Sequence, residues 1–323
     1  MALQAADHTY NTIGTRENLS DLIANISPVD CPLTNMLRKD SAQATYTEWQ
    51  MDSLAAPATN AQLEGDVAPA AVFGATTRAG AYTQIFAKQA SVSGTVQSTN
   101  KAGRGKDELA YQITKKTKEL KRDIEWAFIN NAVQNAGNTT TARQTRGLSG
   151  WIDSNYSIGS GATMPAYTAN STRTSAGNRA LTETLLKSVI QQVYSAGGDP
   201  DIIMANPIQR QVISGFSSSN TRFQDVSNKT LVSTISVYES DFGTLKVVAN
   251  RFQDLTSGST TYTANQGTVY VLESGKLASA FLRNFQVKDL AVTGDYEAKE
   301  ILAEVGLKVD ANNAHGSIRD LTQ

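Results

Sequence analysis

The feature of this chain that most restricts its fold is the long stretch from Lys106 to Ala136, which contains neither proline nor glycine. Apolar residues recur in it at helical spacing and fall within about 100° of arc, the width of a core-facing stripe: Leu109, Ile113, Leu120, Ile124, Ala127 and Phe128. A helix over the whole stretch is about 46 Å long at 1.5 Å per residue. Gly137 follows it in the position of a C-terminal cap. We therefore predict one helix, over 106–136, that lies across more than one packed unit.

The side of this helix opposite the stripe changes character along its length. The first half carries Lys115, Lys118, Glu119, Arg122 and Glu125, and the second half carries Trp126, Ile129 and Val133. The basic cluster Lys115, Lys116, Lys118, Lys121 and Arg122 is interleaved with acidic residues at i,i+3 and i,i+4 spacing. Such interleaving is typical of a solvated, self-paired face and not of a nucleic-acid site. Trp126 fits either an intrachain core or a contact between subunits.

The bulk composition argues against strong electrostatic partners. The 323 residues are enough for two or three packed units. Charged residues make up 18%, below the roughly 25% of an average domain, and the net charge is -1. No global field therefore attracts nucleic acid or an anionic membrane. Cys31 is the sole cysteine, which excludes an intrachain disulfide and suggests a small buried residue.

The N-terminal half outside the long helix suggests a hairpin and an arm. The segment 1–45 is polar with a short helical pattern at 15–26, and it does not resemble a signal peptide. Tyr46–Leu54 is expected to be a strand, with Tyr82–Val96 as its partner, because both are rich in aromatic and β-branched residues. Two strands alone are marginally stable, so the hairpin is expected to lie against something else.

The C-terminal half shows clearer local signals. A helix is predicted over 181–198 with Thr182 as its N-cap, followed by a buried strand from Asp201 and a second helix with Pro207 at its first position. Five strand-like runs follow, within 233–240, 243–250, 267–273, 278–291 and 300–311. Loops and short strands are expected over 138–178. No apolar run is long enough to suggest a membrane span, so we expect a soluble protein made in a cytoplasm.

Catalytic and metal sites have little support in the sequence. The two histidines, His8 and His315, lie near the termini and are expected to be exposed. With one cysteine they do not make a zinc site, and the Gly-Lys pairs lack the rest of a phosphate-binding loop. We therefore expect no enzyme activity, no cofactor and no metal. Composition alone leaves room for a small soluble hydrolase or a glycan-binding protein.

A series of motifs nevertheless points to a known family. They are "ISPVDCPLTNML", "YTEWQMDSLAA", "LEGDV", "YTQIF" with "VSGTV", "AYQITKKTKELKRDIEWAFINN", "RGLSGWI", "YESDFGTLKVVANR", "FLRNFQVKDLAVTGDYEAKEILAEVGLKV" and "AHGSIRDL". In order and spacing they resemble the major head proteins of tailed phages, specifically the SU10-like major capsid proteins. The resemblance covers nearly the whole chain.

This resemblance implies an α+β fold of the HK97 type. It divides the chain into an N-terminal arm (1–45), an E-loop hairpin (46–97), the spine helix with part of the peripheral domain (98–180), an axial domain (181–280) and C-terminal strands returning to the peripheral domain (281–323). The residues expected to serve structure or assembly lie in the matching motifs: Trp49, Glu64, Arg122, Trp126 and Trp151.

The same resemblance implies a structural role in the virion. Subunits are expected to assemble as hexamers and pentamers into an icosahedral-type head around double-stranded DNA, together with scaffold, portal and decoration proteins and without a membrane. The alternative within the fold is the shell of an encapsulin-like bacterial compartment. Some relatives are cross-linked through an E-loop lysine, but this chain has no lysine between Lys39 and Lys88. We therefore expect a shell without that cross-link.

Overall fold

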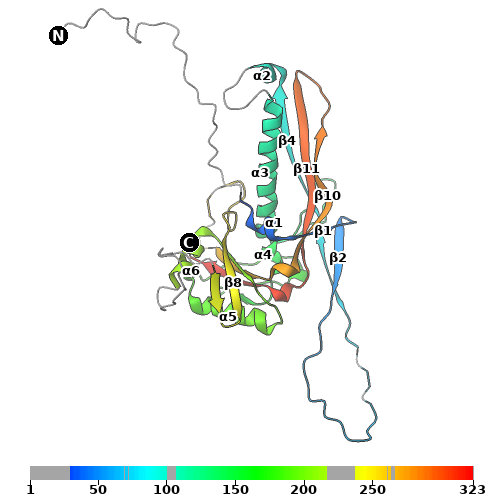
Figure 1. The fold of residues 1–323 in the computed structure, drawn as a ribbon, viewed down its shortest axis with the longest axis vertical. Coiled ribbons are helices and arrows are strands. Elements are labelled where there is room, and N and C mark those ends of the chain that lie inside the picture. The colour runs from blue at the N-terminus through cyan, green and yellow to red at the C-terminus, as the bar shows by residue number, and fades with distance from the viewer. Residues whose placement is uncertain are drawn as a thin grey trace, which may run out of the picture.

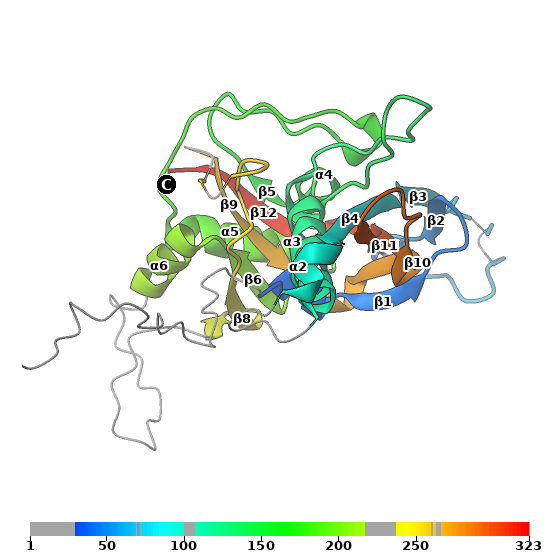
Figure 2. The same cartoon turned by 90° about the horizontal axis from the view of Figure 1, so that it is seen from above.

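The computed structural model describes residues 30–68, 70–71, 73–99, 107–216, 237–259, 261–262 and 266–322. The helical pattern at 15–26 and His8 lie outside these residues. The described chain forms an upright unit, in which the long helix α3 lies along a four-stranded sheet, and a second unit built on a six-stranded sheet (Figure 1). Seen from above, α3 lies between the strands of the two sheets (Figure 2). Its apolar residues share one core with residues of both sheets.

Helix α3 spans Glu108–Asn130, so the predicted helix is confirmed but its C-terminal end is wrong. The Asp107 side chain caps the first turn by accepting a hydrogen bond from the Ala110 N–H at 3.0 Å. After Asn130 the backbone becomes extended, and its hydrogen bonds go to other partners: Gln134 donates to the Asn170 side chain and Asn135 pairs with Gln144. The 23 residues give a helix of about 35 Å.

The predicted apolar stripe of α3 is confirmed. Leu109, Leu120, Ile124, Ala127 and Phe128 are buried, and Ile113 is partly buried. The helix packs on strands β4 (Gln84–Ser93) and β11 (Tyr296–Val309). The sheet order is β1-β10-β11-β4, with β10 at Leu277–Asp289 and β1 at Arg38–Ser41. Strand β1 was not predicted, because its residues are polar; it pairs in parallel with β10 at the sheet edge, and Arg38 and Asp40 form ion pairs with Asp310 and Lys308.

The six-stranded sheet has the order β5-β12-β9-β6-β8-β7. Its strands are β5 (Tyr156–Ser157), β6 (Ile202–Ala205), β7 (Val237–Ser240), β8 (Gly243–Ala249), β9 (Gly267–Leu272) and β12 (Gly316–Leu321). Helices α5 (Glu183–Ser195) and α6 (Pro207–Gly215) cover one face, and the other face belongs to the core shared with α3. Both faces of β6 are therefore buried, which explains its continuous apolar run. The predicted αβα unit is confirmed, including the N-cap at Thr182.

The last strand, β12, differs from the sequence-based expectation. The segment 281–323 divides between the sheets, because β10 and β11 lie in the four-stranded sheet whereas β12 pairs with β9 and β5 in the six-stranded one. His315, expected to be exposed, is fully buried just before β12. Its Nδ1 accepts a hydrogen bond from the Glu273 N–H at 3.2 Å, and burial lowers the pKa of His315 to about 3. The prediction of an exposed terminal histidine is wrong because the C-terminal strand lies inside the sheet.

The hairpin strands pair differently from the prediction. Strand β2 (Tyr46–Met51) pairs with β3 (Thr77–Tyr82), and not with the segment that follows Tyr82. That segment forms β4 and then the short helix α2 (Gly94–Ser98). It leaves the hairpin because β4 has an apolar face, with Phe86, Ala90 and Val92 buried, that is covered by α3.

The remaining short elements connect these parts. They are α1 (Pro32–Met36), α4 (Leu148–Trp151), η1 (Tyr167–Ala169), η3 (Ser274–Lys276) and η4 (Asn312–Ala314). Among the described residues, no helix combines the length and apolar character needed to cross a bilayer.

Candidate assembly surfaces

The loop between β2 and β3, called loop 52–76 and described at 52–68, 70–71 and 73–76, extends far from the rest of the molecule (Figure 1). Four large apolar side chains on it are almost fully exposed: Leu54 at 98%, Leu63 at 80%, Val67 at 85% and Phe73 at 90%. Glu64, a residue singled out in the sequence, lies exposed at the turn closed by the hydrogen bond from the Asp66 N–H to the Leu63 carbonyl. Loops of this length without secondary structure are uncommon in compact domains and are often functional. The loop is a candidate contact surface.

The base of the same hairpin is fixed to the body of the subunit by stacked rings. Trp49 of β2 lies 5.5 Å from Trp151 of α4, and Trp151 lies 5.4 Å from Tyr167, measured between ring centroids. The Arg146 guanidinium lies over the Trp151 ring at 5.1 Å, and the Lys308 ammonium lies 5.8 Å from the centre of the Trp49 ring. Elements far apart in the sequence therefore meet at one aromatic cluster.

Packing, and not hydrogen bonding, holds this aromatic cluster together. Trp151 is 1% exposed, and neither its indole N–H nor that of Trp49 has a hydrogen-bond partner in the described part of the chain. Aromatic pairs contribute roughly 0.5–1.5 kcal/mol beyond the burial of area, and cation–π contacts contribute roughly 0.5–2 kcal/mol. The cluster supports the hairpin base, while loop 52–76 stays outside it.

A second contact holds the point where the chain passes from β3 to β4. The Thr83 hydroxyl donates to Glu304 Oε1 at 3.0 Å, and the Arg283 Nε donates to Glu304 Oε2 at 2.8 Å. Arg143 pairs with the same carboxylate, and its Nε donates to the Thr83 carbonyl at 2.6 Å. Because the Glu304 side chain is only 4% exposed, this charge is compensated by two guanidinium groups. The hairpin thus leaves the sheet from a fixed point.

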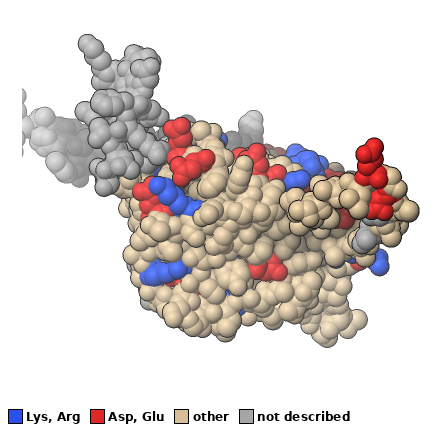
Figure 3. Space-filling view, turned by 90° about the horizontal axis from the view of Figure 1, so that it is seen from below, with Lys and Arg blue, Asp and Glu red and all other residues tan. Residues whose placement is uncertain are grey.

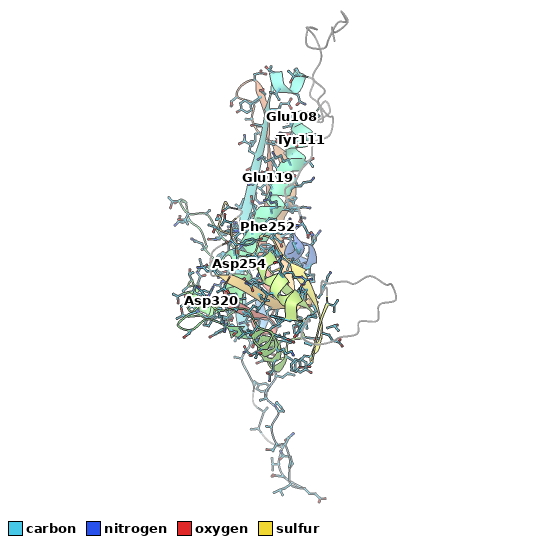
Figure 4. The ribbon with its side chains drawn as sticks, turned by 90° about the vertical axis from the view of Figure 1, so that its left-hand side faces the viewer. Glu108, Tyr111, Glu119, Phe252, Asp254 and Asp320 are labelled. Atoms are coloured by element: carbon cyan, nitrogen blue, oxygen red, sulfur yellow. The ribbon has the colours of Figure 1, made fainter. Side chains whose placement is uncertain are left out.

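Trp126 and Arg122 connect α3 to the six-stranded unit. The Trp126 indole N–H donates to the Leu255 carbonyl at 3.0 Å, and the Arg122 guanidinium lies 5.5 Å from the centre of the Phe252 ring. Asn130 donates to the Phe252 carbonyl at 2.9 Å. Figure 4 shows Glu108, Tyr111 and Glu119 along α3, with Phe252 and Asp254 at the junction and Asp320 in the other unit. Trp126 therefore makes an intrachain contact, one of the two alternatives left open by the sequence.

The charged side of α3 is only partly the solvated face that was expected. Lys116 pairs with Glu119 along the helix at 2.8 Å, as predicted, but Asp123 pairs with Lys88 of β4 at 2.7 Å. The prediction is wrong for Glu125, which is fully buried. Glu125 directly precedes Trp126, where apolar residues begin on this side of the helix. Charged side chains are scattered on the face seen from below and form no continuous basic area there (Figure 3).

A groove with a volume of about 890 Å³ runs between α3, β4 and the segment 251–262. Its walls include the Lys88–Asp123 ion pair, Trp126 and Phe252. In the described part of the chain, no three histidine, cysteine, aspartate or glutamate side chains are grouped to hold a metal ion. The groove lies beside the contact between α3 and the segment that holds Phe252.

Comparison with known proteins identifies relatives over the full length of the chain. A model of the family "SU10 major capsid protein" matches residues 4–322. The major capsid protein of Escherichia phage Phieco32 is 27% identical over 338 aligned positions, which cover 93% of this chain and 92% of that protein. Among solved structures, a capsid chain of cyanophage A-1(L) has a TM-score of 0.68 at 14% identity, covering 95% of this chain and 97% of that one. The SrpI encapsulin complex of Synechococcus elongatus PCC 7942 has a TM-score of 0.59 at 10% identity, with 95% and 93% covered.

Proposed function

We propose, because the chain belongs to the SU10 major capsid protein family, that its subunits assemble as hexamers and pentamers into a closed icosahedral-type head around double-stranded DNA. Its role as the shell-forming major capsid protein of a phage follows from the family. The α+β fold of the HK97 type is confirmed by the likeness to phage capsid chains. The observation that supports the assembly proposal is loop 52–76, whose exposed apolar side chains would be covered if the loop lay on a neighbouring subunit.

Three of the five segments named from the sequence receive roles on this basis. The hairpin of β2, β3 and loop 52–76 acts as the E-loop, α3 as the spine helix and residues 181–280 as most of the axial domain. Strand β4, which the sequence placed in the E-loop segment 46–97, belongs to the four-stranded sheet instead. Trp49 and Trp151 hold the E-loop base, and Arg122 and Trp126 join spine helix and axial domain. Glu64, at an exposed turn, contributes a contact to a neighbouring subunit.

The proposed head is built in a bacterial cytoplasm with scaffold, portal and decoration proteins as partners. A net charge of -1 suits a wall that encloses DNA without binding it tightly. The encapsulin-like alternative draws on a similarity of fold at 10% identity. The family match and the relative at 27% identity favour the phage head.

Electron microscopy of the expressed protein, with its mass in solution measured alongside, tests the assembly proposal. Closed shells, or rings of five and six subunits, are expected from the full chain, expressed alone or with a scaffold protein. A double variant, Leu63→Ser with Phe73→Ser, removes two exposed apolar side chains and should lower the particle yield at least about fivefold, since each buried apolar side chain contributes roughly 1.5–3 kcal/mol. The matched control, Thr59→Ser with Asn60→Ser, changes polar residues of the same loop and should assemble normally. A uniform monomer under both expression conditions would contradict the proposal.

The contents of the particles distinguish a phage head from a compartment. Particles recovered from infected cells are treated with nuclease, and the protected nucleic acid is then extracted and measured. Genome-length double-stranded DNA is expected. Particles that contain protein and no DNA would favour the encapsulin-like alternative.

A further inference from the structure

Glu125 is a buried carboxylate on α3 with hydrogen-bond donors from two other parts of the chain. It accepts hydrogen bonds from the Leu33 N–H at 2.8 Å, from the Thr34 N–H at 2.7 Å and from the Thr34 hydroxyl at 2.5 Å. A fourth donor, the Asn250 side-chain amide, lies at 2.6 Å. Glu125 is fully buried, so these four donors replace the water that a carboxylate otherwise binds.

Three of these donors belong to the first turn of α1 (Pro32–Met36), and two of the three are backbone N–H groups. The first N–H groups of a helix have no partner within the helix, and the N-cap residue Cys31 makes no side-chain capping bond. The Glu125 carboxylate takes the place of the cap from a helix more than 90 positions further along the chain. A negative charge at a helix N-terminus is also favoured by the helix dipole.

The fourth donor belongs to the six-stranded unit. Asn250 directly follows β8, its N–H donates to the Ala205 carbonyl at 2.8 Å, and its Oδ1 accepts from the Phe252 N–H at 2.9 Å. Phe252 in turn lies under Arg122. One carboxylate therefore contacts the start of the described arm, the long helix and the segment that connects to the six-stranded sheet.

This geometry makes the three parts interdependent. If α1 moves away, Glu125 loses three of its four donors while it stays in an apolar surrounding, and a buried carboxylate with few donors is costly. Burial raises the pKa of Glu125, and the hydrogen bonds from Thr34, Leu33 and Asn250 oppose that rise. The buried carboxylate is thus stable only while α1, α3 and the segment that carries Asn250 keep these relative positions.

We propose that Glu125 is a positioning residue that fixes the start of the N-terminal arm to the spine helix and to the axial domain. It thereby fixes the position of α1 on the spine helix and couples that position to the orientation of the axial domain. This joint lies within one subunit, so it does not depend on the proposed shell, and its test uses unassembled protein.

Amide hydrogen exchange read by mass spectrometry tests the joint on the full chain. In Glu125→Gln, a peptide covering residues 31–42 should exchange roughly ten- to one-hundredfold faster, the range expected on loss of hydrogen bonds to a charged group. Peptides from β6, β9 and α5 should keep their protection. The matched control is Glu119→Gln, which removes a carboxylate of the same helix whose ion pair is with Lys116, also on α3. It should leave the exchange of residues 31–42 unchanged.

A second variant keeps the experiment decisive if Glu125→Gln does not fold. Thr34→Val removes one donor, keeps the carboxylate and therefore leaves the electrostatic surroundings of the Cys31 thiol intact. Cys31 is the sole cysteine and is 4% exposed, so its rate of labelling by a maleimide reports opening of α1. The labelling rate should rise roughly tenfold. An unchanged labelling rate in Thr34→Val overturns the proposal. In Glu125→Gln, the proposal is overturned if the exchange of residues 31–42 is unchanged, or if exchange becomes faster to the same extent in both sheets.

Discussion

Replacing Trp126 by alanine tests whether the long helix supports the junction between the two units. The change removes a partly buried indole that packs on the shared core, together with the hydrogen bond to the Leu255 carbonyl. Truncation of a fully buried tryptophan costs about 3–5 kcal/mol, so partial burial accounts for about 2 kcal/mol. The lost hydrogen bond adds about 1 kcal/mol. We therefore expect Trp126→Ala to lower the free energy of unfolding by about 3 kcal/mol.

Urea unfolding of unassembled subunits, followed by far-ultraviolet circular dichroism, measures this loss. Trp126→Phe is the matched control, because it keeps most of the ring and removes only the N–H, so it should cost about 1 kcal/mol. Particles of the alanine variant should form in lower yield and lose their integrity at a lower temperature. The reasoning is refuted if Trp126→Ala stays within about 0.5 kcal/mol of the wild type, the range of a neutral surface change, or if the phenylalanine variant costs as much as the alanine one.

Two further predictions concern acid stability and covalent chemistry. Because the pKa of folded His315 is about 3 and that of an unfolded histidine is about 6.5, only the unfolded chain gains this proton as the pH falls below about 6.5. At pH 5 this proton uptake destabilises the folded state by about 2 kcal/mol. His315→Asn keeps an acceptor for the Glu273 N–H and removes the titrating group. The difference in unfolding free energy between pH 7 and pH 5, measured with urea, should therefore shrink by about 2 kcal/mol. An unchanged difference would contradict the role of His315 in acid stability. Since no lysine lies between Lys39 and Lys88, boiled particles should run as a single subunit band on a denaturing gel, and a ladder of multimers would show the expectation to be wrong.

The sequence alone determined those helices and strands in which buried apolar residues recur at a fixed spacing. The stripe of α3 and the αβα unit around β6 were predicted because apolar spacing and N-caps act over a few residues. The resemblance of the motifs then identified the family and the fold. Trp49 and Trp151 were singled out, but the ring contact that joins them was not.

Only the tertiary structure decided which segments pair and where isolated polar residues find partners. Strand β12 was missed because it carries Arg319 and Asp320, a pair typical of a surface, yet both are fully buried. Arg319 donates to the carbonyls of Ser149 and Ile152, and Asp320 accepts from Gly159 and Arg173. Glu125 was likewise assigned to the charged half of α3, although it directly precedes Trp126, where apolar residues begin on the same side of the helix. A polar side chain is stable in a core only when donors or acceptors surround it, and here these come from residues more than 90 positions away. No local pattern contains that information.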